Sequence, residues 1–438
     1  MRAILLLSFA FFTVQSQAQL INVEDAAKRK TENKVNNKAD QGIDKSLDKI
    51  EEGIGNLFKK KKKKTEPEKN ETAANSKASK QVQQATASGV TDFSAYKSFD
   101  FIPGKDLLFF DDFSISRLGD GRNNWYLRND DEDAPSIITG IKVEPGNWLK
   151  TPRKGVFFPN DFNALPEECT IEFDMYSDAD EMSEMEGGVK VVLLEKSSHR
   201  PDYDRHFSGD PQIGLNIHPY GEKGFINLSA QTGYNGNLTR EEMVLYDQTH
   251  KEGWNAREVN RISIYRKGPL VKLYVNEQLF INLSNALPKR TGYGVLFSTN
   301  MWGNGIYISN IRIATNTANA AADMKATSKF VSSAIYFDVN SARVKPESWP
   351  ALVAAAEAVK AADAPVKIVG HTDTDGDDAF NLVLSQKRAE SVKSILQKEF
   401  GINSSLLTTE GKGETEPVDP LNTPLAKGKN RRVEFISN

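Results

Sequence analysis

Asp373 and Arg388 are the two residues whose types and spacing best support a chemical role. The acid follows an apolar run that predicts a strand, and the base lies fifteen positions later in a segment that predicts a helix. We expect a strand followed by a helix to bring the two side chains to opposite rims of one small pocket. A ligand with an ammonium and a carboxylate on one carbon suits this pair, because each charge keeps a partner when it leaves water. The spacing therefore predicts binding rather than catalysis.

Each residue taken alone also has an ordinary structural interpretation. Asp373 could cap a helix or stabilise a turn, and Arg388 could form a surface ion pair. Near the C-terminus, Arg431 and Arg432 each have two possible roles. They could pair with an acid of the same domain or contact a glycan.

The acids at Asp373, Asp375 and Asp377 alternate as the first ligands of a calcium-binding EF-hand loop do. The sixth position of such a loop requires glycine and here holds Asp378. The twelfth requires glutamate and here holds Leu384. We predict no metal at this loop, and no cofactor elsewhere.

The last 110 residues or so alternate strand and helix patterns, which predicts a compact α/β domain. The predicted elements are a strand at 334–338, a helix at 348–362, a strand at 366–371, a helix at 378–400, a strand at 406–411 and a last strand at 432–436. Gly401 stands where the C-cap of the long helix favours glycine.

Four sequence clusters of this domain occur in a familiar order and spacing. They are Tyr336 to Ala342, Gly370-His371-Thr372-Asp373 with Gly376, Asn381 with Leu384-Ser385 and Arg388-Ala389, and Asn430-Arg431-Arg432-Val433. Together they resemble the OmpA-like C-terminal domain, which is also found in the peptidoglycan-associated lipoprotein Pal and in flagellar stator proteins of the MotB type. The resemblance covers residues 332–438.

The resemblance implies non-covalent binding of peptidoglycan through the diaminopimelate residue of its stem peptide. In that family, the acid at the position of Asp373 takes the ligand ammonium and the arginine at the position of Arg388 takes the carboxylate. Arginine can grip a carboxylate with two parallel hydrogen bonds, whereas aspartate can only accept from an ammonium. We expect the rest of the pocket wall to come from four more residues: Asp338, Asn340, Asn381 and Leu384.

Residues 91–315 predict an antiparallel β-sandwich, because many short alternating strands follow one another without helical patterns between them. The succession of Trp254, 261–265 and 273–276 loosely resembles laminin-G or concanavalin-like jelly rolls. Two roles stay open for this region. It could bind carbohydrate or protein, or it could be a spacer that sets the reach from the wall.

Glu172 and Asp174 resemble the start of the active strand of jelly-roll glycosidases. A retaining glycosidase needs a second carboxyl as its acid, and the matching positions hold Tyr176 or Ser177. We therefore predict no enzyme. A glycan-active enzyme tethered to the wall is the alternative. Trp125, Trp148 and Trp302 could form a sugar platform, although core packing is the more ordinary role.

Cys169 is the one cysteine of the chain, so no intrachain disulfide can form. It alternates with Ile171, Phe173 and Met175 along one face of a predicted strand. This pattern predicts a buried apolar residue rather than a reactive thiol.

The N-terminal residues predict export rather than a folded domain. Residues 1–18 have the charged start, the short apolar run and the small residues of a cleavable signal peptide. Residues 19–90 form a tether with an amphipathic segment and six consecutive lysines, Lys59–Lys64, and carry 16 Lys and Arg against 11 Asp and Glu. This basic run favours contact with anionic lipid over nucleic acid, although a solvated tether is the simpler interpretation. A linker is predicted at 316–330, before the C-terminal domain at 331–438.

Taken together, these patterns predict an envelope protein of a Gram-negative bacterium, located in the periplasm and associated with the outer membrane. Its expected partner is peptidoglycan. Envelope glycans and outer-membrane proteins are further candidates.

Overall fold

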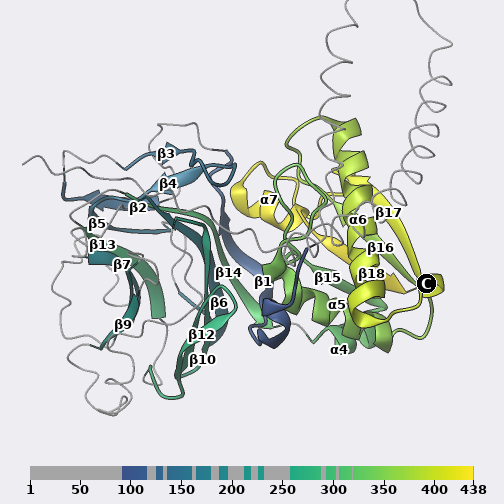
Figure 1. Cartoon of the computed structure of the whole chain (residues 1–438), viewed down its shortest axis with the longest axis horizontal. Coiled ribbons are helices and arrows are strands. Elements are labelled where there is room, and N and C mark those ends of the chain that lie inside the picture. Colours follow the sequence, from purple (N-terminus) through teal and green to yellow (C-terminus); the bar gives the residue numbers. More distant parts are fainter. Residues whose placement is uncertain are drawn as a thin grey trace, which may run out of the picture. The chain divides into compact units, whose positions relative to one another are not determined.

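The computed structural model describes residues 91–115, 125–131, 136–159, 164–178, 187–195, 212–218, 225–230, 257–287, 293–301, 305–317 and 319–437 (Figure 1). The predicted signal peptide, the tether with Lys59–Lys64, and Trp302 lie outside the described residues. None of the described helices is long and apolar enough to cross a membrane.

Residues 104–317, here called the β-rich region, contain two antiparallel sheets. The strands of the first sheet are β1 (Gly104–Asp111), β3 (Ile138–Thr139), β4 (Trp148–Lys150), β6 (Glu168–Ser177), β10 (Asn260–Lys267), β11 (Leu270–Val275), β12 (Gln278–Leu283) and β14 (Ile306–Thr317). They run in the order β12-β11-β10-β6-β14-β4-β3, and β1 also pairs with β14. The hairpin between β10 and β11 turns at Gly268, whose φ of +55° suits glycine.

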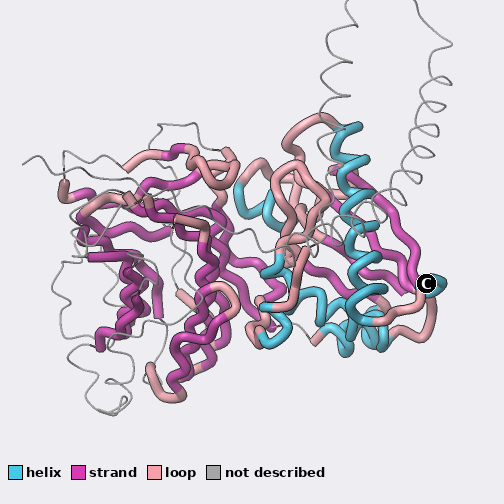
Figure 2. Tube along the Cα trace, in the orientation of Figure 1, coloured by secondary structure: helices cyan, strands magenta, loops and turns pink. Residues whose placement is uncertain are grey.

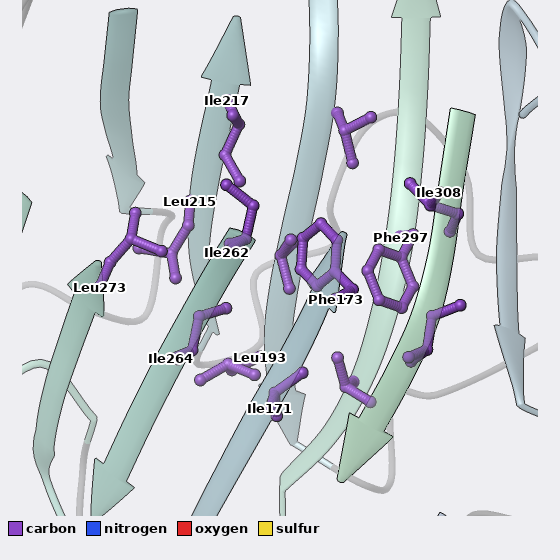
Figure 3. Packing of buried hydrophobic residues seen from close by; sticks show 14 of the residues in the cluster. Ile171, Phe173, Leu193, Leu215, Ile217, Ile262, Ile264, Leu273, Phe297 and Ile308 are labelled. Atoms are coloured by element: carbon purple, nitrogen blue, oxygen red, sulfur yellow. The ribbon is translucent and has the colours of Figure 1, made fainter. Parts of the chain in front are cut away.

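The second sheet has the order β2-β5-β13-β7-β8-β9. Its strands are β2 (Trp125–Asn129), β5 (Lys154–Pro159), β7 (Gly187–Glu195), β8 (Gln212–His218), β9 (Phe225–Ala230) and β13 (Tyr293–Met301). Both sheets contribute to one hydrophobic core. Phe173 of β6 meets Phe297 of β13 edge to face, with ring centroids 5.4 Å apart (Figure 3).

Strand β6 shows the expected alternation of faces. Ile171, Phe173 and Met175 are buried in the shared core, so Glu172 and Asp174 between them point to the opposite face of the sheet. Cys169 also lies in the core and is 1% exposed, which confirms the prediction of a buried residue. Burial raises the pKa of its thiol to about 12, although Arg266 opposes this.

Residues 319–437, here called the C-terminal region, hold all the α-helices of the described residues (Figure 2). The helices are α4 (Ala320–Thr327), α5 (Trp349–Ala361), α6 (Asp378–Phe400) and α7 (Pro424–Asn430). The sheet has the order β15-β18-β16-β17, with β15 at Lys329–Ser332, β16 at Val366–His371, β17 at Leu407–Gly413 and β18 at Val433–Ser437. Strands β16 and β17 are parallel, and α6 supplies the crossover that such a pair requires.

Two differences from the sequence predictions concern this region. The predicted strand at 334–338 is wrong, because the edge strand is β15 and residues 334–338 form a loop with one bridge, Phe337 to Val344. The backbone groups of Tyr336 form their hydrogen bonds with the following turn and not with a neighbouring strand. The N–H donates to Ser348 Oγ at 2.8 Å, and the carbonyl accepts from Lys345 N at 2.9 Å. Within 316–330, the predicted linker, the structure holds α4 and the start of β15.

Residues 91–103 contact both regions. Phe93 belongs to the core of the C-terminal region, and its ring centroid is 5.3 Å from that of Trp349. Phe99 and Phe101 pack instead against Tyr274 of β11, each at 5.5 Å. The segment thus enters the described fold at the C-terminal region before it reaches β1.

Candidate ligand-binding cleft

The turn after β16 carries Asp373 and is held against α6 by close backbone contact. A Cβ on Gly370 would lie 2.3 Å from the carbonyl oxygen of Ser385, so only glycine allows this approach. Thr372 N donates to Gly413 O at 2.9 Å, which ties the turn to β17. These contacts fix the distance between the strand end and the helix that bears Arg388.

Asp373 is 7% exposed and already has a cationic partner. Its Oδ1 accepts from Asp375 N at 3.1 Å, and its Oδ2 forms an ion pair with Arg431. The N-cap of α6 is Asp377, which accepts from two backbone N–H groups of the first turn. Asp373 is therefore not the helix cap, but it does stabilise its turn.

Arg388 is held in place without a carboxylate partner. Its Nε donates to Ser341 O at 3.0 Å, and its guanidinium carbon lies 4.8 Å from the centroid of the Phe337 ring. Burial and, to a lesser extent, the positive charge of Arg431 lower the pKa of Arg388 to about 10, whereas Asp373 opposes this. The guanidinium is thus charged at neutral pH, and no described carboxylate forms a salt bridge with it.

The other arginines of the cleft differ from Arg388 in this respect. Each one that the structure describes is paired with carboxylates: Arg261 with Glu172 and Asp174, Arg312 with Glu172, Arg431 with Asp373 and Asp112, and Arg432 with Glu434. Arg432 thus pairs with an acid of its own domain, which was one of the two predicted roles for this residue. Arg431 pairs both within the C-terminal region and outside it.

The cleft has a volume of about 420 Å³, and Asp373, Arg388, Asn340, Asn381 and Leu384 all line it. This volume is within the roughly 300–1,000 Å³ of typical small-molecule sites. The structure therefore brings five of the six predicted site residues together.

Two of the predicted wall residues have additional structural contacts. Asn381 Nδ2 donates to Glu414 Oε2 at 2.6 Å and to Asp375 O at 3.0 Å, so it also holds the turn after β16. Asp338 is not among the lining residues, and its carboxylate lies 3.5 Å from Arg343 Nη1.

The second wall of the cleft comes from the β-rich region, which sequence reasoning did not foresee. Asp112, Glu144 and Asn310 are among the lining residues from this side. Arg431 Nη2 lies 2.8 Å from Asp112 Oδ2, although the two residues are 319 positions apart. No local pattern around Asp112 marks it, because its role depends on how the two regions pack.

Glu172 and Asp174, the pair weighed as glycosidase carboxyls, lie in a buried ion network. Glu172 Oε1 accepts from Arg312 at 2.7 Å, and its Oε2 accepts from Arg261 at 3.1 Å and from the hydroxyl of Tyr336 at 2.9 Å. Burial alone would raise the pKa of Glu172, but Arg312 and Arg261 hold it below its usual range. Such a carboxylate stays ionised and is no general acid.

Two of the three tryptophans considered as a sugar platform can be placed. Trp125 and Trp148 are 4% and 1% exposed, and Trp125 packs between Phe113, Phe157 and Phe297. Both have the core role that their residue type favours.

The C-terminal region is an α/β domain with a charged cleft at the C-terminal end of β16, the position where such folds commonly bind ligands. Residues 336–431 match the OmpA family, so this part of the chain is an OmpA-family domain.

Relatives of this domain come from several bacteria. Outer membrane protein A of Bordetella avium is 39% identical over 101 residues, 23% of this chain and 52% of the relative. The outer-membrane lipoprotein YfiB of Pseudomonas aeruginosa is 36% identical over 107 residues, 24% of this chain and 63% of the relative. The chain thus spans less than two thirds of each. Among solved structures, the cell wall anchor of the T6SS from Pseudomonas aeruginosa is 29% identical, with a TM-score of 0.23, over 27% of this chain and 94% of that one.

Proposed function

We propose that the C-terminal region binds peptidoglycan non-covalently by holding the diaminopimelate side chain between Arg388 and Asp373. Arg388 takes the carboxylate and Asp373 takes the ammonium. Asn340, Asn381 and Leu384 form the surrounding wall. Asp338 shapes the loop that carries Asn340, through its contact with Arg343.

The observation that carries the proposal is the unpaired guanidinium of Arg388. Arg388 is half-buried, and a charge that is partly removed from water is costly without a counter-ion, which a ligand carboxylate would supply. Arg388 is already oriented by Ser341 and Phe337, which leaves its remaining N–H donors for a ligand carboxylate. The names of the relatives, an outer-membrane protein, an outer-membrane lipoprotein and a cell wall anchor, support this class of partner.

We propose further that the protein is exported by its signal peptide and resides in the periplasm of a Gram-negative bacterium, associated with the outer membrane. The outer-membrane names of two relatives support an envelope location. The two sheets of the β-rich region then form a jelly-roll-like sandwich that binds glycan or protein of the envelope. We assign no glycosidase role to Glu172 and Asp174, because both carboxylates are ion-paired, with Arg261 and Arg312 as the partners.

Pull-down of the full chain by purified sacculi tests the proposal. We expect Asp373→Ala and Arg388→Ala to lose retention by walls that contain diaminopimelate. Lys393→Ala on the same helix is a matched control, since Lys393 does not line the cleft. Walls with lysine in place of diaminopimelate lack the side-chain carboxylate and should retain the unaltered chain much less. Retention of Asp373→Ala and Arg388→Ala equal to that of the unaltered chain would contradict the proposal.

A further inference from the structure

We propose that Asp112 of the β-rich region is a positioning residue of the ligand site. It holds Arg431 and thereby lets Asp373 exchange Arg431 for the ligand ammonium. The inference rests on the proposed function. It adds that the β-rich region supplies a second wall of the same ligand site. The C-terminal region alone would then be an incomplete form of the site.

The guanidinium of Arg431 lies between two carboxylates. Its Nη1 contacts Asp373 and its Nη2 lies 2.8 Å from Asp112 Oδ2. In this arrangement each oxygen of the Asp373 carboxylate already has one partner, so a ligand ammonium competes with Arg431 for this carboxylate. Displacement is costly if Arg431 is left as a second half-buried cation without a counter-ion, next to Arg388.

The β-rich region removes this cost because it supplies two of the contacts of Arg431. Besides the Asp112 ion pair, the guanidinium carbon lies 5.0 Å from the centroid of the Phe110 ring. After the exchange, Arg431 keeps Asp112 and Phe110, while Asp373 keeps the N–H of Asp375 and gains the ligand ammonium. Arg431 and Asp373 therefore each keep a partner before and after binding.

Asp112 is fixed in position for this role. It directly follows β1, and its Oδ1 accepts from Ser114 N at 3.0 Å, which orients the carboxylate. The end of β1 is pressed against α7, where a Cβ on Gly428 would lie 2.8 Å from Phe110 Cγ. Since Arg431 is the C-cap residue of α7, this contact sets the position of Asp112 relative to Arg431.

Three synthetic stem tripeptide amides separate this role from a structural one. They carry diaminopimelate, 2-aminopimelate or lysine at the third position. The 2-aminopimelate peptide keeps the side-chain carboxylate but lacks its ammonium, so it binds Arg388 without displacing Arg431. Calorimetric titration of the full chain at fixed ionic strength gives the affinities.

We expect Asp112→Asn to weaken binding of the diaminopimelate peptide by about tenfold, as loss of a charged hydrogen bond allows. Binding of the 2-aminopimelate peptide should change by less than about twofold, within the range of surface ion pairs. Asp112→Glu keeps the carboxylate and should retain most of the affinity for the diaminopimelate peptide. An equal loss for both peptides would make Asp112 a purely structural residue and overturn the inference, as would unchanged binding of both.

A double-mutant cycle with Arg431→Gln gives a second, independent readout. In that background Asp373 needs no exchange, so Asp112→Asn should have an effect of less than about twofold. A full tenfold loss in both backgrounds would mean that Asp112 acts without Arg431, contrary to the inference.

The two proposals fail in different ways. If Asp373→Ala binds the diaminopimelate peptide as well as the unaltered chain does, both the proposed function and the role of Asp112 are overturned. If Asp373→Ala loses binding while Asp112→Asn does not, only the role of Asp112 is overturned. The lysine peptide should bind weakly to every variant, because it offers Arg388 no carboxylate.

Discussion

The hydroxyl of Tyr336, in the OmpA-family domain, donates a hydrogen bond of 2.9 Å to Glu172 of the β-rich region. The same carboxylate is paired with Arg261 and Arg312, and it is 2% exposed. The outer face of β6 is therefore a buried contact between the two regions and not an open sugar-binding surface.

This contact predicts a large loss of stability when its central acid is neutralised. Glu172→Gln leaves two buried guanidinium groups short of a partner, so we expect the free energy of unfolding to fall by about 3–5 kcal/mol in urea titrations. The control is Lys267→Ala, which breaks a pair with Glu168 at a lysine that is 62% exposed and should cost less than about 1 kcal/mol. Similar losses for both variants would contradict a special role for the buried network.

The close contact of Gly428 with Phe110 predicts that any side chain at position 428 is too large. Gly428→Ala should destabilise the chain by about 1–3 kcal/mol through overpacking, even though alanine favours the helix of α7. Gly140→Ala is a matched control, because its nearest neighbour atom is 4.0 Å away and the change should stay within about 0.5 kcal/mol. Thermal unfolding of both variants would decide, and a neutral Gly428→Ala would count against tight packing of α7 on β1.

Asp111 predicts a pH dependence of stability. Burial raises its pKa from 3.8 to about 6, although hydrogen bonds from Trp125 and from the backbone of Phe113 oppose this. A raised acid pKa favours the protonated folded state, so the stabilisation is complete below pH 3.8 and is lost as the pH rises through about 6. Its size is on the order of 2–3 kcal/mol.

Asp111→Asn isolates this effect, since asparagine cannot titrate. Relative to the variant, the unaltered chain should lose unfolding free energy between pH 4 and 7 in urea titrations. Trp125, whose Nε1 lies 2.8 Å from Asp111 Oδ2, should report the same midpoint in its fluorescence. Parallel stability curves of the two proteins would refute the assignment.

Arg388 predicts opposite effects on stability and on binding. Arg388→Met removes a half-buried charge that has no carboxylate salt-bridge partner among the described residues, so the ligand-free chain should be stabilised by about 1 kcal/mol or left unchanged. Retention by sacculi should be lost in the same variant. If urea titration instead shows a loss of more than about 2 kcal/mol, Arg388 is a structural residue.

Much of the fold follows from local signals. The bounds of β16 and α6 agree with the sequence predictions, because a buried apolar strand, the cap at Asp377 and the left-handed Gly401 mark their ends. The predicted strand at 334–338 failed because Ser348 and Lys345 take the backbone hydrogen bonds of Tyr336, and no alternation pattern encodes that. Helix α7 was missed, although Thr423 as its N-cap and Pro424 in its first turn were visible signals.

The candidate site likewise has a part that local sequence signals predict and a part that they do not. Asp373 and Arg388 lie on one strand-turn-helix unit, so their spacing along the chain already places them near one another. The pairing of Asp373 with Arg431, and of Arg431 with Asp112, depends on side-chain contacts across two regions. Such contacts follow from the packing of the two regions, and no periodic pattern in the sequence predicts them.

The contact of Phe93 with Trp349 has a mechanical consequence for a chain that is anchored through its C-terminal region, as we propose. Tension applied through the chain that precedes residue 91 is delivered first to the core of the C-terminal region, the part that carries Arg388 and Asp373. The β-rich region lies beside this path of force, not in series with it. A spacer must carry load along its length. Under the proposed function, this geometry therefore favours glycan or protein binding by the β-rich region over a spacer role.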